Sequence, residues 1–109
     1  MAETIKVLGQ AAPSATTNTD VYTVPSATTA VVSSIVICNR AGTSATYRLA
    51  VRPAGATLAN QHYVAYDITV GAGDSTGLTL GITLGAADVL TAYASSADLS
   101  ISVFGTEIS

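Results

Sequence analysis

The chain has 109 residues, of which 49% are hydrophobic and only 10% are charged, and its formal net charge is −3. This length fits a single domain with enough apolar side chains for a packed core. An acidic chain with four basic residues lacks the clustered Lys and Arg that phosphate recognition requires, so we expect no nucleic-acid partner.

β-branched residues are dense, and apolar residues alternate with small or polar ones at the two-residue period of a strand. Residues 1–12 are predicted to form an extended arm or an edge strand. The pattern predicts about eight strands, at residues 4–8, 20–24, 31–38, 47–52, 63–70, 78–84, 89–94 and 99–103. Segments with turn chemistry separate them, and only residues 55–61 suit a helical turn. We therefore expect one all-β domain over residues 1–109, an antiparallel β-sandwich or jelly roll, with both arrangements open.

Two of these strands carry the strongest burial patterns. In the strand at 31–38 both faces are apolar, which predicts a central strand or one at an interface. Its faces are predicted to hold Val31, Ile35 and Ile37 on one side and Val32, Val36 and Cys38 on the other. The strand at 78–84 is predicted to bury one row of aliphatic side chains, namely Leu78, Leu80, Ile82 and Leu84.

The sequence contains no motif that positions a catalyst or a cofactor. The glycine-rich segment 71–77 lacks the Lys and the following helix of a phosphate-binding loop, so we interpret it as a turn between strands. The only histidine, His62, has no nucleophile elbow to serve, and the aspartates lack the spacing of a calcium loop. The single Cys38 offers neither an intrachain disulfide nor a metal-ligand set. We therefore predict a protein that is not an enzyme and that binds no metal and no cofactor.

Arg48 and Arg52 share a parity on one predicted strand and should project from the same face. Because the planar guanidinium suits ion pairs at interfaces, we predict that both pair with carboxylates of a neighbouring subunit. The alternative is a solvated strand face. Tyr63 and Tyr66, the other candidates, could face a carbohydrate ligand, whereas the alternative is that the tyrosines cap a small β core.

The scarcity of charge predicts self-association, because a monomer of this composition would expose Ala, Thr and Val faces. The N-terminal segment 2–10, with Ile5 and Val7, is a candidate to extend the sheet of a neighbouring copy by strand addition. No apolar run approaches the roughly 20 residues of a membrane helix, and residues 1–15 lack a signal-peptide h-region. We therefore expect no membrane partner and synthesis in a reducing cytoplasm.

Several turn-and-strand motifs span nearly the whole chain: VLGQAAP at 7–13, VYTVP at 21–25, VVSSIVICN at 31–39, YRLAV at 47–51 and FGTEI at 104–108. In these motifs the chain resembles small structural proteins of tailed bacteriophages. The resemblance implies a β-sandwich that is made in the bacterial cytoplasm and located in the virion. It implies a capsid cement or decoration protein, often a trimer, that contacts itself and other virion proteins such as the major capsid protein. A collar, tail or fibre component remains the alternative, including an adhesin module that binds host glycan.

Overall fold

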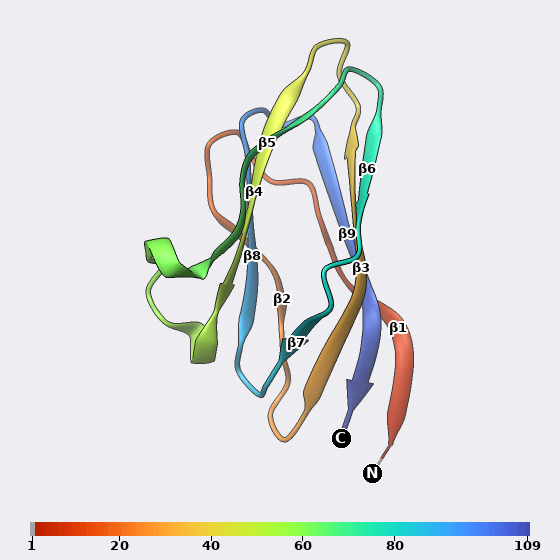
Figure 1. Ribbon diagram of the computed structural model, residues 1–109, viewed down its shortest axis with the longest axis vertical. Helices are drawn as coiled ribbons and strands as arrows, with labels where there is room; N and C mark the ends of the chain where they lie inside the picture. Colours follow the sequence, from red (N-terminus) through yellow and green to blue (C-terminus); the bar gives the residue numbers. More distant parts are fainter. Residues whose placement is uncertain (1) are drawn as a thin grey trace.

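The computed structural model describes residues 2–109, which form two antiparallel sheets packed face to face (Figure 1). Sheet A has the order β1 (Glu3–Ala11), β9 (Leu99–Ile108), β3 (Thr29–Asn39) and β6 (Ser75–Leu78), and β7 (Ile82–Leu84) also pairs with β3. Sheet B has the order β2 (Thr19–Thr23), β8 (Val89–Ala94), β4 (Ala45–Arg52) and β5 (Tyr63–Val70). These strands confirm the predicted all-β antiparallel sandwich.

The strand pairs follow one pattern. β1 pairs with β9, β2 with β8, β3 with β6 and β7, and β4 with β5. Successive pairs alternate between the two sheets, as if one long hairpin were wound around the core. With β6 and β7 filling a single position, this is the topology of an eight-stranded jelly roll.

The strand predicted at 78–84 is interrupted, which is why the described residues form nine strands and not eight. Gly81 has φ +66, and this conformation breaks the extended backbone between β6 and β7. Leu80 consequently leaves the row and is 49% exposed, while Leu84 is fully buried. The predicted continuous buried face of four aliphatic residues is therefore wrong.

The faces predicted for 31–38 are wrong at Val31 and Val32, because the strand contains a β-bulge. The pairing with β9 shifts between Val32 and Ser34, so the alternation of side chains inverts there. Val32 lies on the inner face together with Ile35 and Ile37, whereas Val31 lies on the outer face and is 37% exposed. β3 is nevertheless an interior strand of sheet A, between β9 and the β6 and β7 pair.

The connection between β4 and β5 is the one segment with helical turns. It contains the 3-10 turns Pro53–Gly55 and Asn60–His62, and the second of these falls at the end of the stretch predicted as a helical turn. This connection lies on the outer face of sheet B, where Ala50, Val89 and Thr91 are buried although they point away from the main core. The connection therefore forms a small second layer on sheet B, outside the main core.

The main core between the sheets contains one polar group without a partner. Tyr47 is completely buried on the inner face of β4, and its hydroxyl has no hydrogen-bond partner among residues 2–109. Burial raises the pKa of Tyr47, because the surroundings disfavour the phenolate. A buried hydroxyl that has lost its water contacts destabilises the fold.

We expect Tyr47→Phe to raise the free energy of unfolding by about 1 kcal/mol, because the substitution removes the unpaired hydroxyl and keeps the ring. Urea unfolding followed by circular dichroism measures the change. Tyr93→Phe, at a half-buried tyrosine on the opposite face of sheet B, is the control and should change little. A Tyr47→Phe protein less stable than the wild type would show that the hydroxyl has a partner in solution.

Candidate functional site

The outer faces of the two sheets differ in charge. The strands of sheet B contain Asp20, Arg48, Arg52 and Asp67, and these four residues form two ion pairs. The strands of sheet A contain three charged residues, namely Glu3, Lys6 and Glu107. Lys6 and Glu107 pair with each other. The outer face of sheet B therefore carries two ion pairs, whereas the outer face of sheet A carries almost no charge.

Arg48 is held at the centre of an aromatic cluster on sheet B. Its Nε donates to Asp67 Oδ1 at 2.7 Å, and its guanidinium carbon lies 4.2 Å from the ring centroid of Tyr66 and 4.3 Å from that of Tyr93. The hydrogen bond to Asp67 raises the pKa of Arg48. The guanidinium therefore makes cation–π contacts with two tyrosine rings, and a carboxylate fixes its edge.

A β-bulge in β5 places these groups together. Asp67 has φ +52, and the pairing of β5 with β4 shifts beside it, between Tyr47 and Leu49. The cluster also includes Tyr63, whose ring meets that of Tyr66 edge to face at a centroid distance of 4.9 Å. Tyr66 is 54% exposed, so part of the cluster faces solvent. The two tyrosines predicted from the sequence are thus in contact, and reasoning from sequence missed Asp67 as a member of the cluster.

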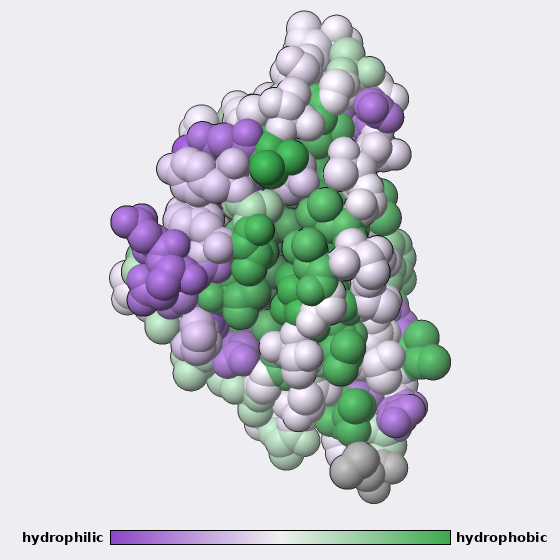
Figure 2. All heavy atoms as spheres, in the orientation of Figure 1, coloured by the Kyte–Doolittle hydropathy of each residue, from purple (hydrophilic) through white to green (hydrophobic). Residues whose placement is uncertain are grey.

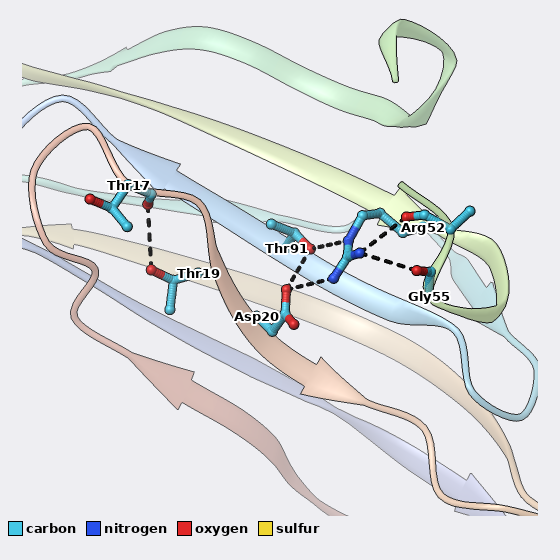
Figure 3. A network of polar contacts seen from close by, with 7 residues as sticks. Thr17, Thr19, Asp20, Arg52, Gly55 and Thr91 are labelled. Carbon is cyan, nitrogen blue, oxygen red and sulfur yellow. Dashed lines mark hydrogen bonds and ion pairs between the residues drawn. The ribbon is translucent and has the colours of Figure 1, made fainter. Parts of the chain in front are cut away.

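Arg52 lies further along the same face in a separate network (Figure 3). Its Nη2 donates to Asp20 Oδ1 at 2.8 Å, and its Nε donates to Thr91 Oγ1 at 3.0 Å. Its Nη1 reaches the carbonyl oxygens of Gly55 and Ala56 at 3.3 and 3.0 Å. Arg52 therefore ties β2, β8 and the β4–β5 connection to β4.

Both arginines project from one face, but their carboxylate partners belong to the same chain. Pairing with a neighbouring subunit stays a prediction, and it would have to compete with these internal contacts. His62 is also engaged, because its Nδ1 accepts a hydrogen bond from the backbone N–H of Ala59 at 3.0 Å. The segment 71–77 forms a tight turn that leads into β6, which begins at Ser75.

The outer face of sheet A carries mainly aliphatic and hydroxyl side chains, together with Phe104 and Gln10. The register places Ile5 and Val7 of β1 opposite Thr106 and Phe104 of β9, and it places Val31 of β3 opposite Thr106. Ile5 is 84% exposed and Val7 is 47% exposed. Glu3, at the edge, is the one charged side chain that the described strands contribute to this face. A surface of this kind is typical of a protein interface.

On the inner side of sheet A, a three-residue cluster ties the chain ends to sheet B. Tyr22 Oη donates to Glu107 Oε2 at 2.6 Å, and Lys6 Nζ lies 3.1 Å from Glu107 Oε1. The hydrogen bond from Tyr22, and then that from Lys6, lower the pKa of Glu107. Burial, with the nearby carboxylate, raises the pKa of Tyr22. The cluster joins β1, β9 and β2.

We expect stability to fall in acid because of Glu107. A carboxylate whose pKa is lowered by folding adds stability above its unfolded pKa, and that stability is lost as the pH falls through the folded value. Between pH 6 and pH 2 the wild type should lose about 1–2 kcal/mol more than Glu107→Gln, by the usual strength of hydrogen bonds to a charged group. Denaturant unfolding at several pH values measures the loss. Glu3→Gln is the control, and equal acid sensitivity of wild type and Glu107→Gln would refute the assignment.

One lateral side of the sandwich is open. β5 of sheet B and β6 and β7 of sheet A are the edge strands there, and Figure 2 shows hydrophobic side chains along the middle of this side. The exposed aliphatic residues of these strands and their link include Ile68 at 43% and Leu80 at 49%. On the opposite side Gly9 of β1 lies against the backbone of Val21 in β2, so that side is closed.

The described part of the chain encloses no pocket. Within residues 2–109 no three His, Cys, Asp or Glu side chains gather as metal ligands. None of the helical turns over the same range is long and apolar enough to span a membrane. No protein-family model matches the chain, and no curated protein matches its sequence. The candidate sites are therefore surfaces, namely the outer face of sheet A with its β1 edge and the tyrosine cluster of sheet B.

Proposed function

We propose that the chain is a non-enzymatic structural component of a bacteriophage virion. In this proposal it is a cement or decoration protein of the capsid, where copies of the chain contact one another and the major capsid protein. Its action is binding alone. Contacts made only in the assembled particle shift the equilibrium toward that particle, as any ligand stabilises the form to which it binds.

The single observation that carries the proposal is the outer face of sheet A. Aliphatic side chains as exposed as Ile5 and Val7 are unfavourable in water, and a partner that covers them and leaves Glu3 at the edge in solvent desolvates no ion. The jelly-roll topology adds support by analogy, because viral capsid domains use it, although lectin domains use it as well.

Two measurements test this function. Sedimentation of the purified chain at increasing concentration should show reversible association that Val31→Lys, on the outer face of sheet A, weakens. Val64→Lys is the matched control, because Val64 is similarly exposed on β5. Mass spectrometry of purified particles should find the chain in hundreds of copies. A chain that stays monomeric and is absent from particles would exclude the proposal, and tens of copies would move it to the tail or collar.

A second candidate function is host-glycan binding in a tail or collar, which the tyrosine cluster favours. Tyr66 is exposed, its ring is held in place by Arg48, and the bulge at Asp67, in the left-handed conformation, fixes the backbone beside it. A preorganised ring with a charged hydrogen-bonding edge suits the apolar face and hydroxyls of a sugar. Tyr66→Ala should then abolish adsorption to host cells while particles remain intact. Unchanged adsorption would leave the cluster as part of the fold alone.

A further inference from the structure

Among the strands at the four edges of the sandwich, β1 is the one whose backbone is open to pairing. β2 has five residues and a bulge between Asp20 and Tyr22, β5 has two register shifts, and β6 and β7 have four and three residues. Short length and bulges are the usual protection of a sheet edge. β1 has nine residues and one register shift, between Val7 and Gly9, and before that shift its pairing with β9 is continuous over residues 3–7.

The hydrogen-bond pattern shows which backbone groups of β1 face outward. Ala2 and Ser109 exchange both of their N–H···O bonds. Because hydrogen-bonded and non-hydrogen-bonded pairs alternate along an antiparallel ladder, Thr4 and Lys6 also bond to β9. The N–H and C=O groups of Glu3, Ile5 and Val7 therefore point to the free edge, where no strand of residues 2–109 pairs with them.

From this edge we infer that two copies of the chain associate through β1, antiparallel about a twofold axis, with Ile5 opposite Ile5 of the second copy. This inference rests on the proposed function, in which copies of the chain contact one another, and it adds a contact through the β1 edge to the contact made by the outer face of sheet A. It joins the two copies of sheet A into one continuous sheet (Figure 1 shows β1 at the margin). Because the axis is perpendicular to the sheet, the two outer faces, each with Glu3 as the one charged side chain of its described strands, lie on the same side and form one surface.

Three arguments select this register. Residues directly opposite each other in an antiparallel pair point to the same face of the sheet. Residues of the outer face must therefore lie opposite residues of the outer face. This is possible only if the twofold axis passes through a residue of β1 and not between two residues. A centre at Lys6 would place two ammonium groups opposite each other. Among residues 2–109 a centre at Thr4 uses four backbone hydrogen bonds, from Glu3 and Ile5 of both copies, whereas a centre at Ile5 uses six, from Glu3, Ile5 and Val7 of both copies.

The side chains of β1 also favour pairing centred on Ile5. The two Ile5 side chains, each 84% exposed in the single chain, meet across the axis, and each Val7 lies opposite Glu3 of the other copy. An inward-pointing lysine on an edge strand discourages the addition of another strand, and Lys6 occupies such a position on β1. Its ammonium is held by Glu107 at 3.1 Å, so its charge is compensated within its own chain.

Cysteine crosslinking tests the register in the full-length chain carrying Cys38→Ser. Ile5→Cys should form a covalent dimer under mild oxidation, because opposite residues of a hydrogen-bonded pair lie within disulfide distance. Val7→Cys alone should not form one, but an equal mixture of Val7→Cys and Glu3→Cys should. Crosslinking of Ile5→Cys no greater than that of Val7→Cys overturns the inference. So does a trimer, because head-to-tail contacts cannot place a residue opposite itself.

A proline substitution provides an independent test without oxidation. The N–H of Ile5 faces the free edge, so Ile5→Pro removes no bond to β9 but removes both central bonds of the pairing. The dissociation constant of the dimer should rise about thirtyfold, and Ile5→Val should leave it unchanged. An unchanged constant in a folded Ile5→Pro protein contradicts the inference. If the chain is present in particles but Ile5→Cys does not crosslink, the pairing fails and the proposed function stands.

Discussion

Gly105→Ala should lower the free energy of unfolding by about 3 kcal/mol or more, the upper part of the range for overpacking a core. Gly105 lies in β9 between Lys6 of β1 and Val32 of β3. A Cβ built there would overlap the carbonyl oxygen of Val31 and would lie 3.0 Å from Cδ1 of Leu8. The carbonyl belongs to a strand that is paired on both sides, so the backbone cannot move aside without breaking the ladder.

The matched control for this prediction is Gly77→Ala. Gly77 is also a strand glycine, in β6, and a Cβ there would meet no atom within 4 Å. Its replacement should change stability by no more than about 0.5 kcal/mol. Urea unfolding of the two variants against the wild type measures both effects. Similar stability of the two variants would show that the sheet relaxes around Gly105 and would contradict the argument.

Asn39→Asp should have a comparably large effect at neutral pH, about 3 kcal/mol. Asn39 is 1% exposed at the end of β3. Its Nδ2 donates to the carbonyl oxygens of Thr43 and Val70 at 2.8 and 3.1 Å, and its Oδ1 accepts from the N–H of Ala41 at 3.0 Å. A carboxylate in this position faces two carbonyl oxygens with no proton to donate.

The pH dependence of this variant separates charge from packing. At pH 4 a protonated carboxyl can donate to one of the two carbonyl oxygens, so the destabilisation relative to the wild type should be smaller than at pH 7. Asn60→Asp, at an exposed position, is the control and should be nearly neutral at both pH values. A loss that is equal at the two pH values would mean that the backbone has rearranged around residue 39.

The sequence predicts a face correctly where the strand itself contains no extra residue. β9 alternates strictly from Leu99 to Ile108, because the bulges of its two ladders lie in β1 and β3. Arg48 and Arg52 share a face because β4 and β8 pair without a shift. Where a bulge intervenes, the parity rule gives the wrong face. The bulge in β3 falls at Ser33 and Ser34, whose side chains give no signal for it, and it moves Val32 to the inner face.

Partners of the candidate residues could not be predicted, because they come from distant parts of the chain. Arg52 pairs with Asp20, and Glu107 binds both Tyr22 and Lys6. Such contacts follow from the order of strands in the sheets, which alternation alone does not determine. Tyr63 and Tyr66 were predicted as a pair, but their geometry depends on the left-handed conformation of Asp67. Aspartate tolerates this conformation without requiring it.

The near absence of charge from the outer face of sheet A has a consequence for how an assembly would respond to ionic strength. Screening weakens contacts between ions, whereas sulfate and similar salts strengthen the burial of apolar surface. Particles held together by this face should therefore tolerate concentrated brine and become tighter in ammonium sulfate. The ion pairs of Arg48 and Arg52 lie on the other sheet, away from this contact.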